Sequence, residues 1–309
     1  MSQQVTVDYR GISIQVQAQC DTAIHSLCAI DKTLDRIHRT ADKLETVKVK
    51  EYEAYLKKSK ETIQNQIEKF KATLDKYKEA RAYSINNHQP QYQEFLRFTE
   101  QVKKESADLT KLVNELTGSK LAVIDQMIDE GLLNAGQESL QNMLNKARGV
   151  LNIDSNMIEK INQIEDVSLR ELAYRELLKE ENANLSFDNI LSKAQDEYDI
   201  LLGKKTKEVI EEYKEELKNN GLSTDAIANV TTIDEANKVV NNAITDEKVR
   251  KETLKIIIKA IKDRGFIVDT KKNLKIDRER NIVKLVALKA SGQMAEFEIQ
   301  LNGKFMYHF

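Results

Sequence analysis

Between Gly11 and Gly118 the chain contains no other glycine and only one proline, Pro90. Turns and strands use glycine and proline, whereas long helices exclude both from their interiors. The sequence therefore predicts long helices for this region. The whole chain of 309 residues has ten glycines and a single proline, so we expect a mainly α-helical protein.

Apolar residues in this region repeat with the three-and-four spacing of a coiled-coil seam. The three seams are Leu27, Ile30, Leu34, Ile37, Ala41 and Leu44; Leu56, Ile63, Ile67, Phe70, Leu74 and Tyr77; and Phe95, Val102, Leu109 and Leu116 with Phe98 and Leu112. The second seam is out of phase with the first, which predicts a stutter or a short break near residues 45–50.

A polar stretch, "SINNHQPQYQ" at residues 84–93, separates the second seam from the third. The residue before a proline avoids the α region, and asparagine tolerates turns. We therefore predict a coiled-coil arm over residues 1–118 that contains an antiparallel helical hairpin (residues 56–116) with its tip near 84–93. A three-helix bundle of the same segments is the alternative. The alternating segments "VTV" and "ISIQV", between Val5 and Val16, also fit strands.

Residues 119–244 predict a central helical bundle, because their apolar spacing indicates shorter amphipathic helices with recognisable ends. Capping boxes are expected at Ser168 with Glu171 and at Thr232 with Glu235. The "NNG" at residues 219–221 should stop a long charged helix.

Residues 245–309 predict a small α+β module. A helix should end at Gly265, since glycine accepts the left-handed conformation after a helix. Five short alternating segments then predict an antiparallel β-meander whose dry face is covered by that helix. Turns are expected at Ser291-Gly292 and, as type I′, at Asn302-Gly303. The last strand ends without a cap, which suggests that the natural polypeptide continues past Phe309.

The net charge of −2 conceals an asymmetry. Residues 248–289 hold 14 Lys and Arg against five Asp and Glu, a net charge of +9, and residues 290–309 carry −1, so residues 1–247 carry −10. A basic cluster stands near the predicted hairpin: Lys271, Lys272, Lys275, Arg278 and Arg280. Such a cluster can contact phosphates or an acidic protein surface. Asp277 and Glu279 interrupt the cluster, and no aromatic residues are interleaved with it. This pattern favours a solvated face or a contact with an acidic protein surface, which can be this chain's own, over nucleic-acid binding.

Catalytic and ligand-binding motifs are not found. The sequence has no H-E-x-x-H, G-x-S-x-G or G-x-G-x-x-G, and "LLGKKTKE" at residues 201–208 lacks the first glycine and the hydroxyl of a phosphate-binding loop. We therefore expect no enzyme activity, cofactor or metal. Cys20 and Cys28 lie about 12 Å apart along a helix, too far for a disulfide, and no apolar run could span a membrane. These features favour a cytoplasmic protein.

The sequence is most consistent with a non-enzymatic coiled-coil scaffold or adaptor subunit of a larger cytoplasmic assembly. We expect Leu27, Ile30, Leu34 and Ile37 to form a seam that binds a partner helix or a second copy, because the predicted hairpin leaves them without a mate. The competing interpretation is that they pack on the central bundle.

Other functions fit less well. The alternative is a nucleic-acid-binding accessory subunit that acts through the basic module. A helical pore-forming toxin would need an apolar tongue, and the predicted tip is polar. A metal-dependent nuclease could use Asp269, Asp277 and the "EFEIQ" strand, but the expected acid on the middle strand is missing.

Overall fold

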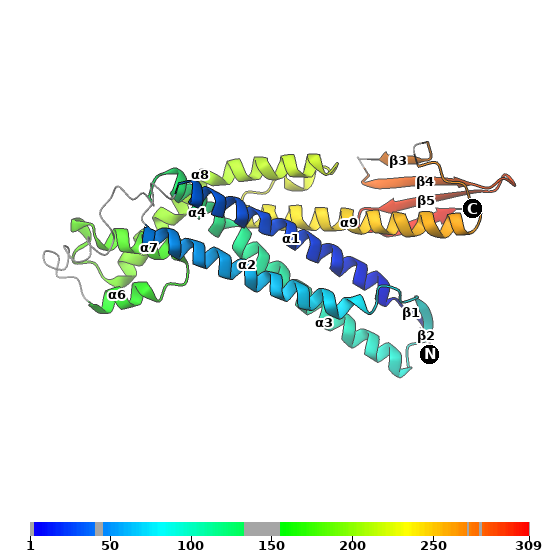
Figure 1. The fold of residues 1–309 in the computed structure, drawn as a ribbon, viewed down its shortest axis with the longest axis horizontal. Helices are drawn as coiled ribbons and strands as arrows, with labels where there is room; N and C mark the ends of the chain where they lie inside the picture. The colour runs from blue at the N-terminus through cyan, green and yellow to red at the C-terminus, as the bar shows by residue number, and fades with distance from the viewer. Residues whose placement is uncertain (1–2, 41–45, 133–154, 271, 278–279, 309) are drawn as a thin grey trace.

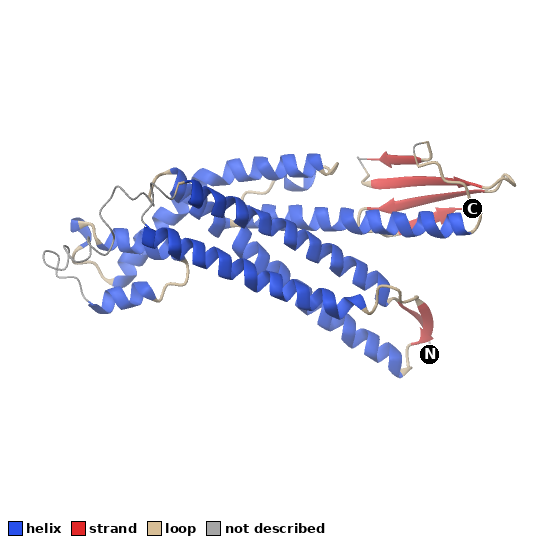
Figure 2. Ribbon diagram, viewed as in Figure 1, coloured by secondary structure: helices blue, strands red, loops and turns tan. Residues whose placement is uncertain are grey.

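The computed structural model describes residues 3–40, 46–132, 155–270, 272–277 and 280–308. The molecule is elongated, with long helices along its length and a four-stranded sheet at one end (Figure 1). Helices dominate, and within these described ranges the strands are confined to the chain's beginning, the loop before α3 and the C-terminal module (Figure 2). The predicted mainly α architecture with a small C-terminal α+β module is confirmed.

Three long helices form one bundle: α1 (Tyr9–Arg39), α2 (Thr46–Asp75) and α3 (Pro90–Thr117). The chain reverses direction between α1 and α2, and again between α2 and α3 at the predicted tip (Figure 1). Of the predicted break near residues 45–50, residues 46–50 belong to α2 and residue 45 lies outside the described residues. Buried residues from all three seams share a single hydrophobic cluster. Because α1 contacts both α2 and α3, the arrangement is the three-helix alternative and not a hairpin that stands apart from α1.

The tip of the bundle carries a two-stranded sheet of β1 (Gln4–Val7) and β2 (Tyr83–Asn86). The "VTV" strand is thus confirmed. The "ISIQV" strand is wrong, because Asp8 caps α1 by accepting a hydrogen bond from the Gly11 N–H at 2.8 Å, and the segment continues as helix. Next to this sheet the ring of Tyr9 stacks on that of Tyr77, with centroids 4.7 Å apart.

The shorter helices α4 (Ser119–Asp129), α6 (Ser155–Asn162) and α7 (Val167–Leu177) and the first half of α8 (Phe187–Asn219) pack on the same cluster. Two 3₁₀ turns, Glu180–Asn182 and Asp225–Ile227, join the longer elements. Asp166, not Ser168, caps α7, since its carboxylate accepts hydrogen bonds from the N–H groups of Ser168 and Leu169. The predicted capping box at Ser168 is therefore wrong by two residues.

Helix α9 (Ile233–Asp263) is continuous across residues 244 and 245, where the sequence suggested a boundary. It begins at the predicted cap, with the Glu235 N–H donating to Thr232 Oγ1 at 3.3 Å. It ends before Gly265, which has a φ of 80°. Its first half packs on the second half of α8, and its second half packs on the sheet.

The sheet has the order β3 (Leu274–Asp277), β4 (Ile282–Leu288), β5 (Met294–Gln300) and β6 (Phe305–His308), with antiparallel neighbours. Its dry face packs on Ile257 and Ile261 of α9, which confirms the covering helix. The buried strand residues are Val283, Leu285, Ala287, Ala295, Phe297 and Ile299.

Two local predictions for the module are wrong. Residues 266–270 do not form a full strand, and of them Ile267 makes an isolated bridge to Leu288. The last turn is not type I′: Gly303 has a φ of 79°, but Asn302 has no positive φ. The connection instead closes through Gly303 N–H to the Gln300 carbonyl, 3.0 Å, and Gln300 N–H to the Lys304 carbonyl, 2.7 Å.

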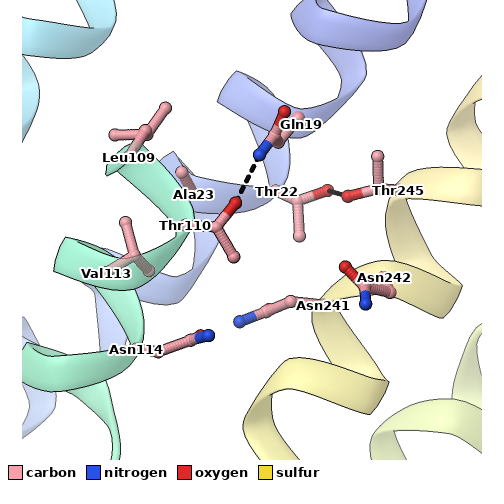
Figure 3. A pocket seen from close by; sticks show the side chains of 10 residues that line it. All are labelled: Gln19, Thr22, Ala23, Leu109, Thr110, Val113, Asn114, Asn241, Asn242 and Thr245. Carbon is pink, nitrogen blue, oxygen red and sulfur yellow. Dashed lines mark hydrogen bonds between the residues drawn. The ribbon is translucent and has the colours of Figure 1, made fainter. Parts of the chain in front are cut away.

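Polar contacts join α9 to the helical bundle. Thr245 Oγ1 donates to Thr22 Oγ1 at 3.0 Å, and Ser26 Oγ donates to Asn241 Oδ1 at 2.9 Å. All described members of the bundle's hydrophobic cluster lie between Ile12 and Leu202, so α9 contributes none. A cavity at this junction measures about 20 Å³ (Figure 3), space for about one water molecule. Polar side chains thus connect separate hydrophobic cores here, and this cavity is too small for a ligand.

Candidate protein-interaction surface

The predicted partner seam lies inside the molecule. Leu27, Ile30, Leu34 and Ile37 are at most 7% exposed and belong to the cluster shared with α2, α3 and α4. Helix α1 packs on α2 and α3 of the predicted arm as well as on α4 of the predicted central bundle, so the competing interpretation, packing on the central bundle, describes only part of the contact. A partner helix could reach them only by displacing one of those helices, so a partner surface has to be sought elsewhere.

The basic cluster gathers at one edge of the sheet. Lys275 lies on β3, while Lys272 and Arg280 lie in the turns on either side of it, and all three are exposed. The Arg280 N–H donates to Asp277 Oδ1 at 3.1 Å, which ties this residue to the end of β3. The predicted residues Lys271 and Arg278 lie outside the described residues.

The solvent-exposed face of the sheet carries both signs of charge. Lys275 of β3 pairs with Lys284 of β4, which in turn faces Glu298 of β5. Lys284 Nζ lies 2.5 Å from Glu298 Oε1; this hydrogen bond raises the pKa of Lys284 and lowers that of Glu298. Glu296 adds a second carboxylate to β5. A nucleic acid laid across this face would bring its phosphates against two carboxylates, which disfavours this route to binding.

Large apolar side chains are exposed mainly on the C-terminal module. Among the described residues eleven large hydrophobic side chains are exposed, and seven of them belong to the module: Ile267, Ile276, Leu288, Met294, Phe305, Met306 and Tyr307. The other four, Ile24, Tyr83, Leu96 and Ile200, lie on β2 and three different helices. Scattered exposed apolar residues are normal, whereas a concentration of them marks an interaction surface.

A groove of about 610 Å³ runs between the C-terminal half of α9 and strand β6, and we call it the α9–β6 groove. Its apolar lining is Ile261, Phe266, Met294, Phe297, Phe305 and Tyr307. Arg264 and Lys289 are the charged residues among those that line it. The Lys289 ammonium lies 4.6 Å from the centroid of the Phe266 ring, so this cation borders the apolar surface.

The groove exists because one helix covers four strands. Strands lie about 4.8 Å apart, so four of them span about 14 Å, whereas a helix with its side chains is about 10 Å wide. Helix α9 packs on β4 and β5. Phe305 and Tyr307 pair with Ile299 and Phe297 and therefore share the helix-covered face, yet they remain 47% and 56% exposed.

The α9–β6 groove was not predicted from the sequence. The aromatic residues Phe305 and Tyr307 alternate with Lys304, Met306 and His308 in the sequence, which predicts a strand but not how much of its face a helix covers. The signal that could have revealed the groove is the mismatch between four strands and the single amphipathic helix that precedes them. Periodicity shows that a face is apolar, but not how far a helix covers it.

A larger cleft, about 1220 Å³, lies between α1 and the second half of α8. Two of its basic side chains face carboxylates: Arg36 Nη1 lies 2.7 Å from Asp125 Oδ1, and Lys205 Nζ lies 2.8 Å from Glu208 Oε2. Burial raises the pKa of Asp125 although Arg36 opposes this shift. Because these two cations are engaged by the chain's own carboxylates, the cleft is a weaker candidate for a binding surface than the α9–β6 groove.

A metal site, as a nuclease would need, is not found in the part of the chain that the structure describes. There, no group of three His, Cys, Asp or Glu side chains is placed to hold a metal ion. The nuclease candidates Asp277 and Glu298 are engaged by the Arg280 N–H and by Lys284, respectively.

Comparisons with known proteins returned no matching protein family, no similar curated protein and no similar solved structure. Across the described residues, none of the helices combines the length and the apolar character needed to cross a membrane.

Proposed function

We propose that the protein is a non-enzymatic scaffold or adaptor subunit that binds another protein through the exposed apolar surface of its C-terminal module. The observation that carries this proposal is the α9–β6 groove, which joins exposed aromatic side chains to a basic border. Surfaces that combine aromatic residues and arginine are typical of protein interfaces.

The rest of the fold suits such a role. Helix α9 is one continuous helix that packs on the bundle at one end and on the sheet at the other. It therefore holds the module at a fixed place on an elongated helical body (Figure 1). In this proposal the interaction surface is not the α1 seam expected from the sequence, because that seam is buried.

A photo-crosslinking experiment in the native cell tests the proposal. A photoreactive phenylalanine analogue replaces Tyr307 at the groove, and in a matched control it replaces Ile200, which is 60% exposed on α8. We expect a discrete crosslinked protein at position 307 that is absent at position 200. The adduct should disappear when Phe305→Ser is added.

Identical crosslinks at both positions would contradict the proposal. Nuclease-sensitive adducts at position 307, together with a high ratio of absorbance at 260 to 280 nm after low-salt purification, would favour the nucleic-acid-binding alternative. The chain has no tryptophan and ten tyrosines, so even a little nucleic acid would raise this ratio.

A further inference from the structure

The geometry points to a particular occupant of the α9–β6 groove: an amphipathic helix of a partner protein whose apolar face is flanked by acidic residues. This inference rests on the proposed function, because it names the kind of partner that the same surface binds.

The shape of the groove suits a helix that lies beside α9. Packed helices lie about 8–10 Å apart, and α9 leaves the β6 side of its own sheet face uncovered. On the groove side α9 presents the exposed Ala260 one turn before Arg264, and so small a side chain permits a close approach. The rings of Phe305 and Tyr307 then supply the apolar floor.

The two cations that line the groove indicate which charges the partner helix should carry. Arg264 and Lys289 would be desolvated when an apolar ridge fills the groove, and a buried cation without a partner is costly. No acidic side chain belongs to the groove lining among the described residues. Carboxylates on the partner helix would supply the missing counter-charges, whereas a basic helix would add like charges to a module that is already strongly basic.

Three other occupants fit less well. Added strands bind along the sheet edge, but the described part of β6 has only four residues, and the groove lies over the sheet face. A second copy of the module would bring basic residues against basic residues. A single-stranded nucleic acid needs a basic track, and the exposed Lys272, Lys275 and Arg280 lie at the opposite, β3 edge.

The test uses the full chain and two synthetic 20-residue peptides. Both carry leucine at helical i, i+3, i+4 and i+7 positions; glutamate flanks this face in one and lysine in the other. Fluorescence anisotropy should show saturable binding of the acidic peptide and at least about tenfold weaker binding of the basic one, a difference of about 1.4 kcal/mol.

Variants locate the binding site. The double substitution Arg264→Glu with Lys289→Glu should reverse the preference between the peptides. Tyr307→Ser should weaken binding of the acidic peptide about tenfold, and the matched control Ile200→Ser should leave it unchanged. These side chains contribute little to the core, and circular dichroism of each variant verifies the fold.

Several results would overturn the inference. Absence of binding by either peptide, or equal binding that the double substitution does not alter, excludes an acidic helix as the occupant. Displacement of the acidic peptide by a thymidine 20-mer would assign the groove to nucleic acid, and a dimer that Tyr307→Ser dissociates would assign it to a second copy. If the peptides fail while the crosslink at position 307 persists, the proposed function stands and only the helical partner is wrong.

Discussion

Replacing Phe297 by alanine should unfold the C-terminal module while the helical bundle stays folded. Phe297 is 5% exposed and belongs to the cluster formed by α9, β4 and β5. That cluster is separate from the one that holds α1, α2 and α3 together. The two clusters are connected by α9, which contacts α1 through polar side chains such as Thr245 and Thr22.

The magnitude follows from burial and size. A buried phenylalanine changed to alanine costs about 3–5 kcal/mol, because transfer and cavity contributions add. A small module with a single core rarely has more than about 3–5 kcal/mol of stability of its own. The substitution should therefore remove most of the stability of the sheet. The free energy of unfolding of the bundle should change little, because its core is larger and shares no described residue with the sheet.

Hydrogen exchange read by mass spectrometry separates the two regions. In Phe297→Ala, peptides from residues 282–300 should lose nearly all protection, while peptides from residues 102–116 should keep theirs. Ile63→Ala, at a fully buried position in the bundle, should show the converse pattern. Phe305→Ala, on the same sheet face but exposed, serves as the matched control and should change neither region.

Equal loss of protection in both regions of Phe297→Ala would refute the reasoning. It would show that the polar contacts between α9 and the bundle couple the two cores into one cooperative unit. Unchanged protection in residues 282–300 would instead show that the sheet does not depend on this ring.

Three further predictions concern single groups. Cys28 is exposed and should react with Ellman's reagent in the native protein. Cys20 should react more slowly, because burial raises its pKa from 9.0 to about 11, which makes its thiolate fraction about 100-fold smaller. Equal reaction rates of the two thiols, measured by mass spectrometry, would contradict the burial of Cys20. The free energy of unfolding should fall above about pH 10, because burial raises the pKa of several tyrosine phenols, which therefore ionise at lower pH in the unfolded chain. These phenols are Tyr52, Tyr198 and Tyr213. Each such phenol lowers the free energy of unfolding by up to about 1.4 kcal/mol per pH unit. A free energy of unfolding that stays constant to about pH 11 would contradict this prediction. Gly118→Ala should lower the free energy of unfolding by about 1–3 kcal/mol, because a Cβ there would lie 2.6 Å from the Asn114 carbonyl oxygen. A urea unfolding midpoint equal to that of the wild type would show that this Cβ is accommodated without crowding.

Local chemistry made the ends of elements predictable. Thr232 and Gly265 bracket α9 as their capping roles require, and Gly221, with a φ of 74°, follows the end of α8. Ser168 misled because Asp166 stands two residues earlier and its carboxylate accepts the two N–H groups that a cap must satisfy. Two competing caps within three residues cannot be ranked from residue type alone.

The suggested boundary at residues 244 and 245 shows a different limit. It followed from the change between a region of shorter helices and a helix that leads into the sheet, but a change of pattern does not end a helix. Between Thr232 and Gly265 the sequence has no glycine and no proline, and the structure has one helix there. The absence of glycine and proline predicted the extent of the helix better, because these two residues act on the backbone itself.

The seams show why burial was predictable and the partner was not. Spacing placed Leu27 and Ile30 on an apolar face, and both are buried. The same spacing fits a contact with another protein or with the chain's own α2, α3 and α4. That choice depends on how the helices fold back on one another, which involves residues far apart in the sequence.

Phe305 and Tyr307 separate folding from binding in this chain. Each remains about half exposed beside α9, on the part of the helix-covered sheet face that α9 leaves open, so serine at both positions should lower the free energy of unfolding by only about 1–2 kcal/mol, a fraction of what full burial contributes. The loss is not zero, because the Tyr307 ring lies 6.3 Å from that of Phe297. Partner capture at the groove should nevertheless be lost. A double variant that retains its partner would remove the reason for assigning these rings to binding, since the fold hardly requires them.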